Sequence, residues 1–451
     1  EMKTPRKGQG RARSLQGQRS PTPSTLRLDR LAALLERANG FAQPADQMLS
    51  LYFKSHPELG PRERGFLADS FYAAVRHWSS LQAQVEPTQT RWRRMALLSA
   101  SLGVGMDRIV SEITEGERAW LRASLEAAAQ AEPVSLRLSL PEWVWQRWVQ
   151  QLGPQEAEQC AVASLQEAPL DLRVNLLKAQ ADAVLSALEQ SGIRAERQQV
   201  LSEGLRVHGR PSLSRTASFL SGDVEVQDLG SQLLARLCAP RRGEFVVDFC
   251  AGAGGKTLAL GALMRNTGRL YALDTSAARL QRLKPRLARS GLSNVWPIAI
   301  SGLGDERLLR LAGKAGLVLV DAPCTGLGTL RRNPDLKWRQ SEQGLPSLLE
   351  QQASILRAAA RLVGPKGRLV YATCSTLQEE NEDQVERFLR EQTGFERLSA
   401  RDALSRAGLE LPPDWRAFSA SGELRLWPHR TQTDGFYGVI LARRAGSVGQ
   451  S

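Results

Sequence analysis

The feature that most constrains this chain is a repeating pattern in its second half, where short apolar runs alternate with segments of helical periodicity. From about Val224 onward, the apolar runs fall at residues 245–248, 269–274, 294–300, 316–320 and 367–373. Continuous apolar runs separated by helices are typical of buried parallel strands. We therefore expect a doubly wound α/β domain, which binds its ligands at the carboxyl ends of the strands.

A glycine-rich loop follows the first of these strands and leads into a helix. It reads Cys250-Ala-Gly-Ala-Gly-Gly-Lys256, and glycines at such a turn let the backbone approach a ligand at the helix N-terminus. A phosphate-binding P-loop would need glycine at Cys250, and a dinucleotide fingerprint would need glycine at Thr257. Asp274 ends the next strand, where a carboxylate can accept the ribose hydroxyls of an adenosine cofactor. A purely structural turn is the alternative.

Two further strands each lead into a cysteine beside polar residues. Cys324 follows the strand that ends at Asp321, and Cys374 comes directly after another strand. A single cysteine beside an apolar strand is usually a small buried hydrophobe, as we expect for Cys160 and Cys238. Two at one sheet edge indicate chemistry instead. The four histidines lie far from both in sequence, so no metal site is expected.

The first half of the chain predicts helices rather than strands. Apolar residues share one helical face over residues 31–38 and again over 62–78, and helical periodicity continues to about Gly153. After Pro169 the pattern changes to strand-like alternation around a helix over 179–191. We expect a multidomain chain with a basic tail over 1–25, an all-α domain over 26–155, a small α+β module over 160–218 and the α/β domain over 219–445.

The net charge of +13 favours a polyanionic partner, with nucleic acid as the first candidate. Residues 1–30 hold eight basic and two acidic residues, a net +6, in a segment whose composition predicts disorder. A second basic cluster follows Cys324 and includes one aromatic residue. Such a cluster can hold phosphates and stack a base, so we expect it to bind RNA, with a solvated loop as the alternative. Its members are Arg331, Arg332, Lys337, Trp338 and Arg339.

Targeting signals are not evident in the sequence. No apolar run reaches the roughly 18 residues of a membrane span, and no apolar segment follows the basic start as in a secretory signal. Five scattered cysteines do not form a disulfide framework. We expect a cytoplasmic monomer with no membrane partner.

Together these motifs resemble those of the Fmu/Sun (RsmB/NOP) family of AdoMet-dependent RNA cytosine-C5 methyltransferases. The likeness covers nearly the whole chain after the basic tail, and residues 59–66 are similar to the NusB-like domain of the bacterial 16S ribosomal-RNA members. The paired cysteines are its most specific part. The other matching segments are 172–175, 226–228, 248–256, 321–324, 331–338, 373–375 and 434–437.

The resemblance implies a NusB-like, RNA-binding N-terminal domain and a C-terminal Rossmann-like class I methyltransferase domain. It implies S-adenosyl-L-methionine (AdoMet) as cofactor and RNA, above all ribosomal RNA, as substrate. Cys374 would add to C6 of cytosine, which makes C5 nucleophilic enough to take a methyl group. Cys324 would assist removal of the C5 proton and product release. Asp321 would form a hydrogen bond with the edge of the cytosine ring. Lys256 would lower the pKa of a nearby thiol or hold a carboxylate in place.

The sequence departs from the family pattern in two places. The family loop usually reads Cys-Ala-Ala-Pro-Gly-Gly-Lys, whereas this chain has Gly252 and Ala253 at the third and fourth positions. Family members usually have an aspartate near the end of the third strand to contact adenine, whereas here Ser301 holds about that position and Asp305 follows. The cofactor-binding residues that the resemblance implies are Cys250, Ala251, Gly252, Ala253, Gly254, Gly255, Lys256, Asp274, Ser301 and Asp321.

Two other functions stay open on the sequence. An NAD-type oxidoreductase would also carry the glycine loop and Asp274, although it would leave the paired cysteines unexplained. A non-catalytic RNA-binding assembly factor could keep the fold without turnover, as the altered loop and Ser301 allow.

Overall fold

The computed structural model describes residues 23–444, which form two compact units. The first unit includes residues 46–74 and 81–128 and the chain before Gly40, and the second includes 40–45, 75–80 and the chain from Ala129 onward. Most of the tail predicted over residues 1–25 lies outside the described residues, and a helix already begins at Pro23.

The first unit is helical, as the apolar periodicity predicted. Leu31 of the first helix, Phe71 of the third and Met95 of the fifth are fully buried in its core. Arg93 pairs with both Asp29 and Glu117 and so joins three of the helices. The main helices that contribute to it are α1 (Pro23–Ala38), α2 (Ala45–Ser55), α3 (Pro61–Arg76), α5 (Arg91–Val104) and α6 (Glu115–Ala129).

The second unit begins with short helices and a small antiparallel sheet. The helices are α7 (Val134–Arg137), α8 (Glu142–Leu152) and α9 (Pro154–Leu165), together with the first three residues of α4 (Trp78–Gln82). The sheet has the order β2 (Ala195–Arg197), β3 (Gly204–Val207), β1 (Leu170–Val174) and β4 (Val224–Val226). Leu172 and Val174 alternate with polar residues and pack on Val184 and Leu188 of α10 (Ala181–Gln190). A short helix, α11 (Ala217–Leu220), precedes β4.

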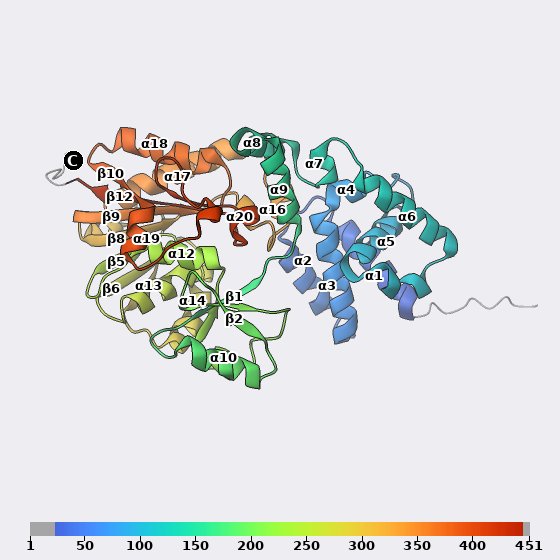
Figure 1. Cartoon of the computed structure of the whole chain (residues 1–451), viewed down its shortest axis with the longest axis horizontal. Coiled ribbons are helices and arrows are strands. Elements are labelled where there is room, and N and C mark those ends of the chain that lie inside the picture. The colour runs from blue at the N-terminus through green and yellow to red at the C-terminus, as the bar shows by residue number, and fades with distance from the viewer. Residues whose placement is uncertain (1–22, 445–451) are drawn as a thin grey trace, which may run out of the picture. The chain divides into compact units, whose positions relative to one another are not determined.

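The rest of the second unit is an α/β domain with an eight-stranded sheet (Figure 1). Its strand order is β10-β12-β9-β8-β5-β6-β7, and β11 pairs with β12. The five strands predicted from the sequence are the parallel ones, β5 (Phe245–Asp248), β6 (Arg269–Asp274), β7 (Val295–Ala299), β8 (Ala315–Asp321) and β9 (Val363–Thr373). The antiparallel strands are β10 (Phe395–Leu398), β11 (Leu424–Leu426) and β12 (Phe436–Arg443).

Helices cover both faces of this sheet, which confirms the doubly wound prediction (Figure 1). One apolar core packs beneath α12 (Leu229–Cys238), α13 (Gly255–Leu263), α14 (Ala277–Ser290) and α19 (Ala400–Arg406). The other core packs beneath α15 (Glu306–Leu311), α17 (Leu345–Ala360) and α18 (Glu382–Glu391). The remaining short helices are α16 (Leu336–Arg339) and α20 (Pro428–Thr431).

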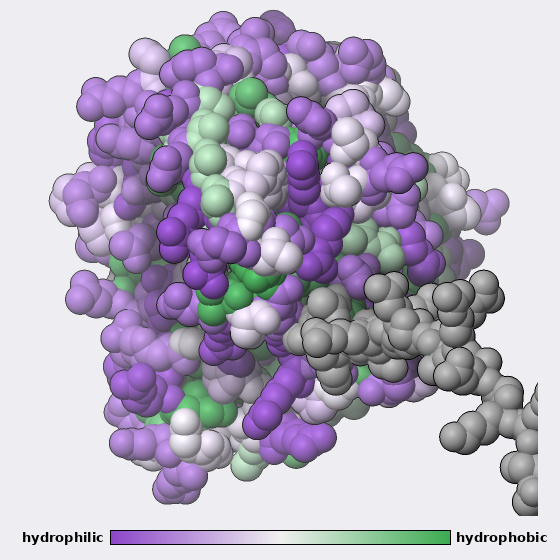
Figure 2. Space-filling model, turned by 90° about the vertical axis from the view of Figure 1, so that its right-hand side faces the viewer, coloured by the Kyte–Doolittle hydropathy of each residue, from purple (hydrophilic) through white to green (hydrophobic). Residues whose placement is uncertain are grey.

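One face of the molecule is largely polar. Figure 2 shows a face on which hydrophilic side chains predominate and apolar ones form small separate patches. Within residues 23–444, no helix combines the length and the apolar character needed to cross a membrane.

Candidate active site

A cavity of about 730 Å³ opens at the carboxyl ends of the parallel strands. The chain passes from β5 to β6 on one side of the sheet and later returns to β8 on the other side of β5. At such a switch point the loops diverge, which makes room for a ligand. The volume suits a nucleoside-sized cofactor. Ten of the predicted site residues line it, namely Cys250, Ala251, Gly252, Ala253, Gly255, Lys256, Asp274, Asp321, Cys324 and Cys374.

The glycine loop is held against the end of the second strand by Asp274. The Gly252 amide donates to Oδ2 of Asp274 at 2.9 Å, and the Ser276 amide donates to Oδ1 at 2.7 Å. Each carboxylate oxygen keeps a further lone pair for a ligand in the cavity. Gly252 has a φ of +56°, and a Cβ there would meet nothing within 4 Å. The loop therefore leaves open space beside a carboxylate, as a ribose-bearing cofactor requires.

Gly254 is required for a different reason, because it begins α13 with a φ of +83° and lies against Leu283. A Cβ at Gly254 would lie 2.2 Å from Cδ1 of Leu283. We expect Gly254→Ala to lower the free energy of unfolding by about 2–3 kcal/mol, through left-handed strain and overpacking. Urea denaturation measures this change in the free energy of unfolding. Gly252→Ala is the matched control, with strain but no clash, and should cost about 1 kcal/mol; equal losses would refute a role for Leu283.

The end of the third strand differs from the prediction. Ser301 is exposed, and its amide and hydroxyl donate to Asp305 at 2.8 and 3.2 Å. Asp305 also caps α15 through the Arg307 amide at 2.9 Å. Neither residue lines the cavity; Gly302 and Leu303 do. The Asp305 carboxylate engages the Ser301 amide and hydroxyl outside the cavity lining, and a contact of Ser301 with the cofactor stays a prediction.

The two predicted catalytic thiols are in contact. The Sγ atoms of Cys324 and Cys374 lie 3.4 Å apart although the residues are 50 positions apart in sequence. Parallel pairing of β8 with β9 sets Asp321 opposite Ala372, so the loops that follow these two residues emerge side by side. The hydrogen bond to Cys374 and burial raise the pKa of the Cys324 thiol well above its usual range. Cys324 therefore keeps its proton in the free protein.

A lysine–aspartate pair lies beside the thiols. Nζ of Lys256 is 2.8 Å from Oδ2 of Asp321 and 5.6 Å from the ring centroid of Phe436. Burial lowers the pKa of Lys256, but the charges of Asp321 and Cys374 outweigh it, so the pKa ends above its usual value. Lys256 is therefore an ammonium ion that orients Asp321 at the cavity that Cys374 also lines.

Asp248, the last residue of β5, lies in the site although it was not among the predicted site residues. It is 1% exposed and lines the cavity, and its Oδ2 accepts from the Thr257 hydroxyl at 2.7 Å. Oδ1 has no hydrogen-bond partner in the part of the chain that the structure describes. Burial raises the pKa of Asp248 to about 7. The available signal was an acidic residue ending an apolar strand directly before a glycine loop.

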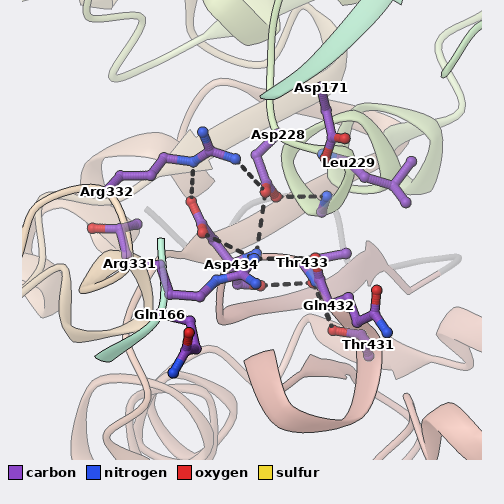
Figure 3. Close-up of polar contacts among 12 residues, drawn as sticks. Gln166, Asp171, Asp228, Leu229, Arg331, Arg332, Thr431, Gln432, Thr433 and Asp434 are labelled. Atoms are coloured by element: carbon purple, nitrogen blue, oxygen red, sulfur yellow. Dashed lines mark hydrogen bonds and ion pairs between the residues drawn. The ribbon is translucent and has the colours of Figure 1, made fainter. Parts of the chain in front are cut away.

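Two arginines of the predicted RNA-binding cluster form an internal clasp (Figure 3). The guanidinium of Arg332 donates to Asp434 at 2.7 Å and to Asp228 at 2.9 Å. Arg331 is buried and donates to the carbonyl of Gln432 at 3.1 Å. The clasp fastens the loop after Cys324 to the start of α12 and to the segment before β12.

The other members of the cluster are also engaged inside the second unit. Lys337 is buried, and its Nζ donates to the carbonyl of Arg76 at 2.7 Å. Trp338 donates its indole N–H to the carbonyl of Val75 at 2.8 Å, and Arg339 lies 3.5 Å from Asp335. Arg331, Arg332, Lys337 and Trp338 thus already bond to carbonyls and carboxylates within the second unit, whereas Arg339 is exposed. RNA binding by these five residues stays a prediction.

This clasp predicts a large effect of Arg332→Ala on stability. Removal of the guanidinium would leave the buried carboxylates of Asp228 and Asp434 without a counterion they share. Breaking a buried ion pair costs roughly 3–5 kcal/mol, and because Arg332 is 28% exposed we expect about 3 kcal/mol by chemical denaturation. Arg357→Ala, which breaks two exposed pairs, is the control and should cost under about 1 kcal/mol. Similar losses of stability in Arg332→Ala and Arg357→Ala would show that Arg332 does not fasten these segments together.

The cavity at the strand ends has a carboxylate placed for the ribose of an adenosine cofactor, and two thiols beside it. The glycine loop does not match a phosphate-binding P-loop. These features place the chain among the Rossmann-like methyltransferases. The model of the "16S rRNA methyltransferase RsmB/F" family matches residues 235–442. The probable ribosomal RNA small subunit methyltransferase B of Synechocystis is 31% identical over 429 residues, which are 87% of this chain and 94% of the relative. The chain therefore belongs to the RsmB/F methyltransferase family.

Further relatives agree with this assignment. The probable ribosomal RNA small subunit methyltransferase B of Bacillus subtilis is 32% identical over 314 residues, 68% of this chain and 67% of the relative. The solved structure of PH0851 has a TM-score of 0.73 and 27% identity, and the match covers 94% of this chain and 99% of that one. NSun6 from Pyrococcus horikoshii, solved with SFG, has a TM-score of 0.58 and 22% identity over 67% and 98% of the two chains, and shares the fold.

The ferredoxin-like domain model of RsmF/B-like methyltransferases matches residues 140–214. This range includes β1, β2 and β3 of the small antiparallel sheet but not β4, and it begins before the module predicted over 160–218.

AdoMet is the cofactor of this family, and the cavity fits it. Asp274 is placed to accept from the ribose, and the space beside Gly252 is free of side chains. Unionised or ionised, Asp248 offers an unpaired oxygen to a polar group of the cofactor. Among the described residues, no group of three His, Cys, Asp or Glu side chains is placed to hold a metal ion.

Proposed function

We propose that this chain methylates C5 of cytosine in RNA of the small ribosomal subunit through a covalent Cys374–C6 adduct. The observation that carries the proposal is the 3.4 Å contact between the Cys324 and Cys374 thiols at the cavity that fits AdoMet. The curated relatives support the RNA assignment, because they are named as small subunit ribosomal RNA methyltransferases.

Each residue of the pair would have a separate task. The Cys374 thiolate, stabilised by the Lys256 ammonium, adds to C6, and the C5–C6 double bond then supplies the electron pair for C5. Bound AdoMet supplies the methyl group from its sulfonium. Asp321, which Lys256 orients at 2.8 Å, would accept a hydrogen bond from the exocyclic amine or the protonated N3 of cytosine. Once Cys374 is bonded to C6 it carries no charge, so Cys324 would lose its own proton to solvent and, as a thiolate, take the proton from C5. The C5–H electron pair would then re-form the C5–C6 double bond and expel Cys374 as a thiolate.

The residues that would hold AdoMet follow from the same geometry. Asp274 would accept from the ribose hydroxyls, and the glycine loop over 250–255 would lie along the cofactor. Gly302 and Leu303 would take the place at the third strand that we predicted for Ser301. The target base would have to be unpaired or flipped out to reach the thiols.

We further propose that the helical first unit is a NusB-like domain that grips RNA around the target base. The first unit ends at Ala128, and the domain limits predicted from the sequence, 26–155, 160–218 and 219–445, stay predictions. Support comes from the all-helical core built around Leu31, Phe71 and Met95.

The test is transfer of labelled methyl from AdoMet to small-subunit RNA from a strain that lacks this protein. We expect label in 5-methylcytidine on nucleoside analysis, and bisulfite sequencing would identify the position. Label in another nucleoside would contradict C5 chemistry. A folded protein that binds RNA and AdoMet without incorporating label would favour the assembly-factor alternative.

A further inference from the structure

A buried carboxylate outside the cofactor cavity contacts both cysteine loops. Glu380 ends a short helical turn over Gln378–Glu380 and is 0% exposed. Its carboxylate accepts from the Thr325 amide at 2.8 Å and the Thr325 hydroxyl at 2.6 Å. It also accepts from the Ser375 hydroxyl and from Nε2 of Gln352 at 2.9 Å. Thr325 and Ser375, the two loop residues that Glu380 binds, are the residues immediately after Cys324 and Cys374.

The donor set indicates that Glu380 is ionised. The Ser375 hydroxyl receives the Leu377 amide at 3.0 Å, so its own proton is free to point to Glu380. Amide, hydroxyl and carboxamide groups all donate, and a protonated carboxyl would lose one acceptor position among them. Burial raises the pKa of Glu380, and the hydrogen bonds from Ser375 and Thr325 limit that rise.

The two cysteine loops depend on Glu380 to different degrees. The Cys374 loop has other supports: the Ser375 carbonyl accepts from Asn381 at 3.0 Å, and the Cys374 carbonyl accepts from the Gly328 amide at 2.9 Å. Thr325, in contrast, directs both its amide and its hydroxyl to the one carboxylate. Glu380 is therefore the main polar anchor of the residue after Cys324.

Charge is distributed unequally around the thiols as a result. The Glu380 carboxylate is bonded to the residue after Cys324 and is one of the causes that raise the pKa of that thiol, whereas the Lys256 ammonium lines the same cavity as Cys374. A carboxylate disfavours a nearby thiolate and an ammonium favours one, and both effects are strong where water is excluded.

We propose that Glu380 is a positioning residue that fixes the contact between the two thiols and confines their shared negative charge to Cys374. This assignment rests on the proposed function only in naming Cys374 as the nucleophile. The division of labour between two chemically identical side chains then arises from the groups behind them.

Thiol reactivity tests this without RNA or methyl transfer. The folded protein is treated with limiting iodoacetamide, and alkylation of Cys324 and Cys374 is quantified by peptide mass spectrometry. In the wild type we expect Cys374 to react in preference. In Glu380→Gln the ratio of Cys374 to Cys324 alkylation should fall about tenfold, as a relative pKa change of one unit produces. Glu379→Gln is the matched control, because that carboxylate pairs with Arg147 instead and should leave the ratio unchanged.

A wild-type ratio in folded Glu380→Gln would overturn the proposal, as would an equal fall in Glu379→Gln. If circular dichroism shows that Glu380→Gln does not fold, Thr325→Val replaces it, since it keeps the carboxylate but removes one tie to the Cys324 loop. Alkylation of Cys324 should then rise, and unchanged protection would refute the anchor. Because the assay needs no substrate, an inactive enzyme with the expected ratios would count against the proposed function alone.

Discussion

Replacement of Cys374 with alanine is expected to abolish methyl transfer, with a loss of about 10⁴-fold or more in turnover, as for removal of a covalent nucleophile in other enzymes. Without the thiolate, C6 receives no electron pair and C5 stays a poor nucleophile. The measurement is incorporation of labelled methyl into small-subunit RNA under single-turnover conditions. AdoMet affinity should change little, because the carboxylate of Asp274 and the glycine loop stay in place.

Cys160→Ala is the matched control for this substitution. Cys160 is fully buried in another part of the second unit and does not line the cavity. It should retain activity within about twofold once folding is verified, since the loss of one buried sulfur costs only about 1–2 kcal/mol of stability. Wild-type turnover in Cys374→Ala would show that this thiol is not the nucleophile.

Replacement of Cys324 with alanine is expected to have the opposite visible effect, accumulation of a covalent RNA–protein complex. Addition of Cys374 to C6 and methylation of C5 would still occur, but removal of the C5 proton would lack its assisting thiol. The C6–sulfur bond would then persist through denaturation. A band of RNA-shifted mobility on a denaturing gel, present in Cys324→Ala and faint in the wild type, measures this outcome.

The double substitution Cys324→Ala/Cys374→Ala separates this adduct from non-specific crosslinks. It should form no stable complex, because the only attacking sulfur is gone. A complex that survives the double substitution would assign the bond to another residue, and its absence in Cys324→Ala would mean that Cys324 has no role in release.

The features that sequence predicted well are those set by local pattern and by strand adjacency. The five parallel strands follow from continuous apolar runs, and their ends bring Gly252, Asp274, Cys324 and Cys374 to one rim. A strand-end position is a local property, and the parallel sheet turns it into proximity. This is why residues 50 positions apart in the sequence, such as the two cysteines, were correctly placed together.

The features that sequence missed depend on partners that no local pattern reveals. Arg332 looked like an exposed cation until Asp228 and Asp434, each about a hundred positions away, were placed around it. Ser301 looked like a cofactor contact because the capping role of Asp305 depends on where α15 begins. Glu380 carried no signal of its own, since its role lies in the loops it joins.

The inward-facing arginines have a consequence for how this protein would respond to salt. When a protein binds RNA, each phosphate that it neutralises releases condensed counterions, and affinity falls with ionic strength in proportion to their number. Arg331 and Arg332 already donate to carbonyl and carboxylate oxygens, and Lys337 donates to a backbone carbonyl. These three cations therefore release no counterions on binding. The ionic-strength dependence of RNA affinity is set by other basic residues of this chain.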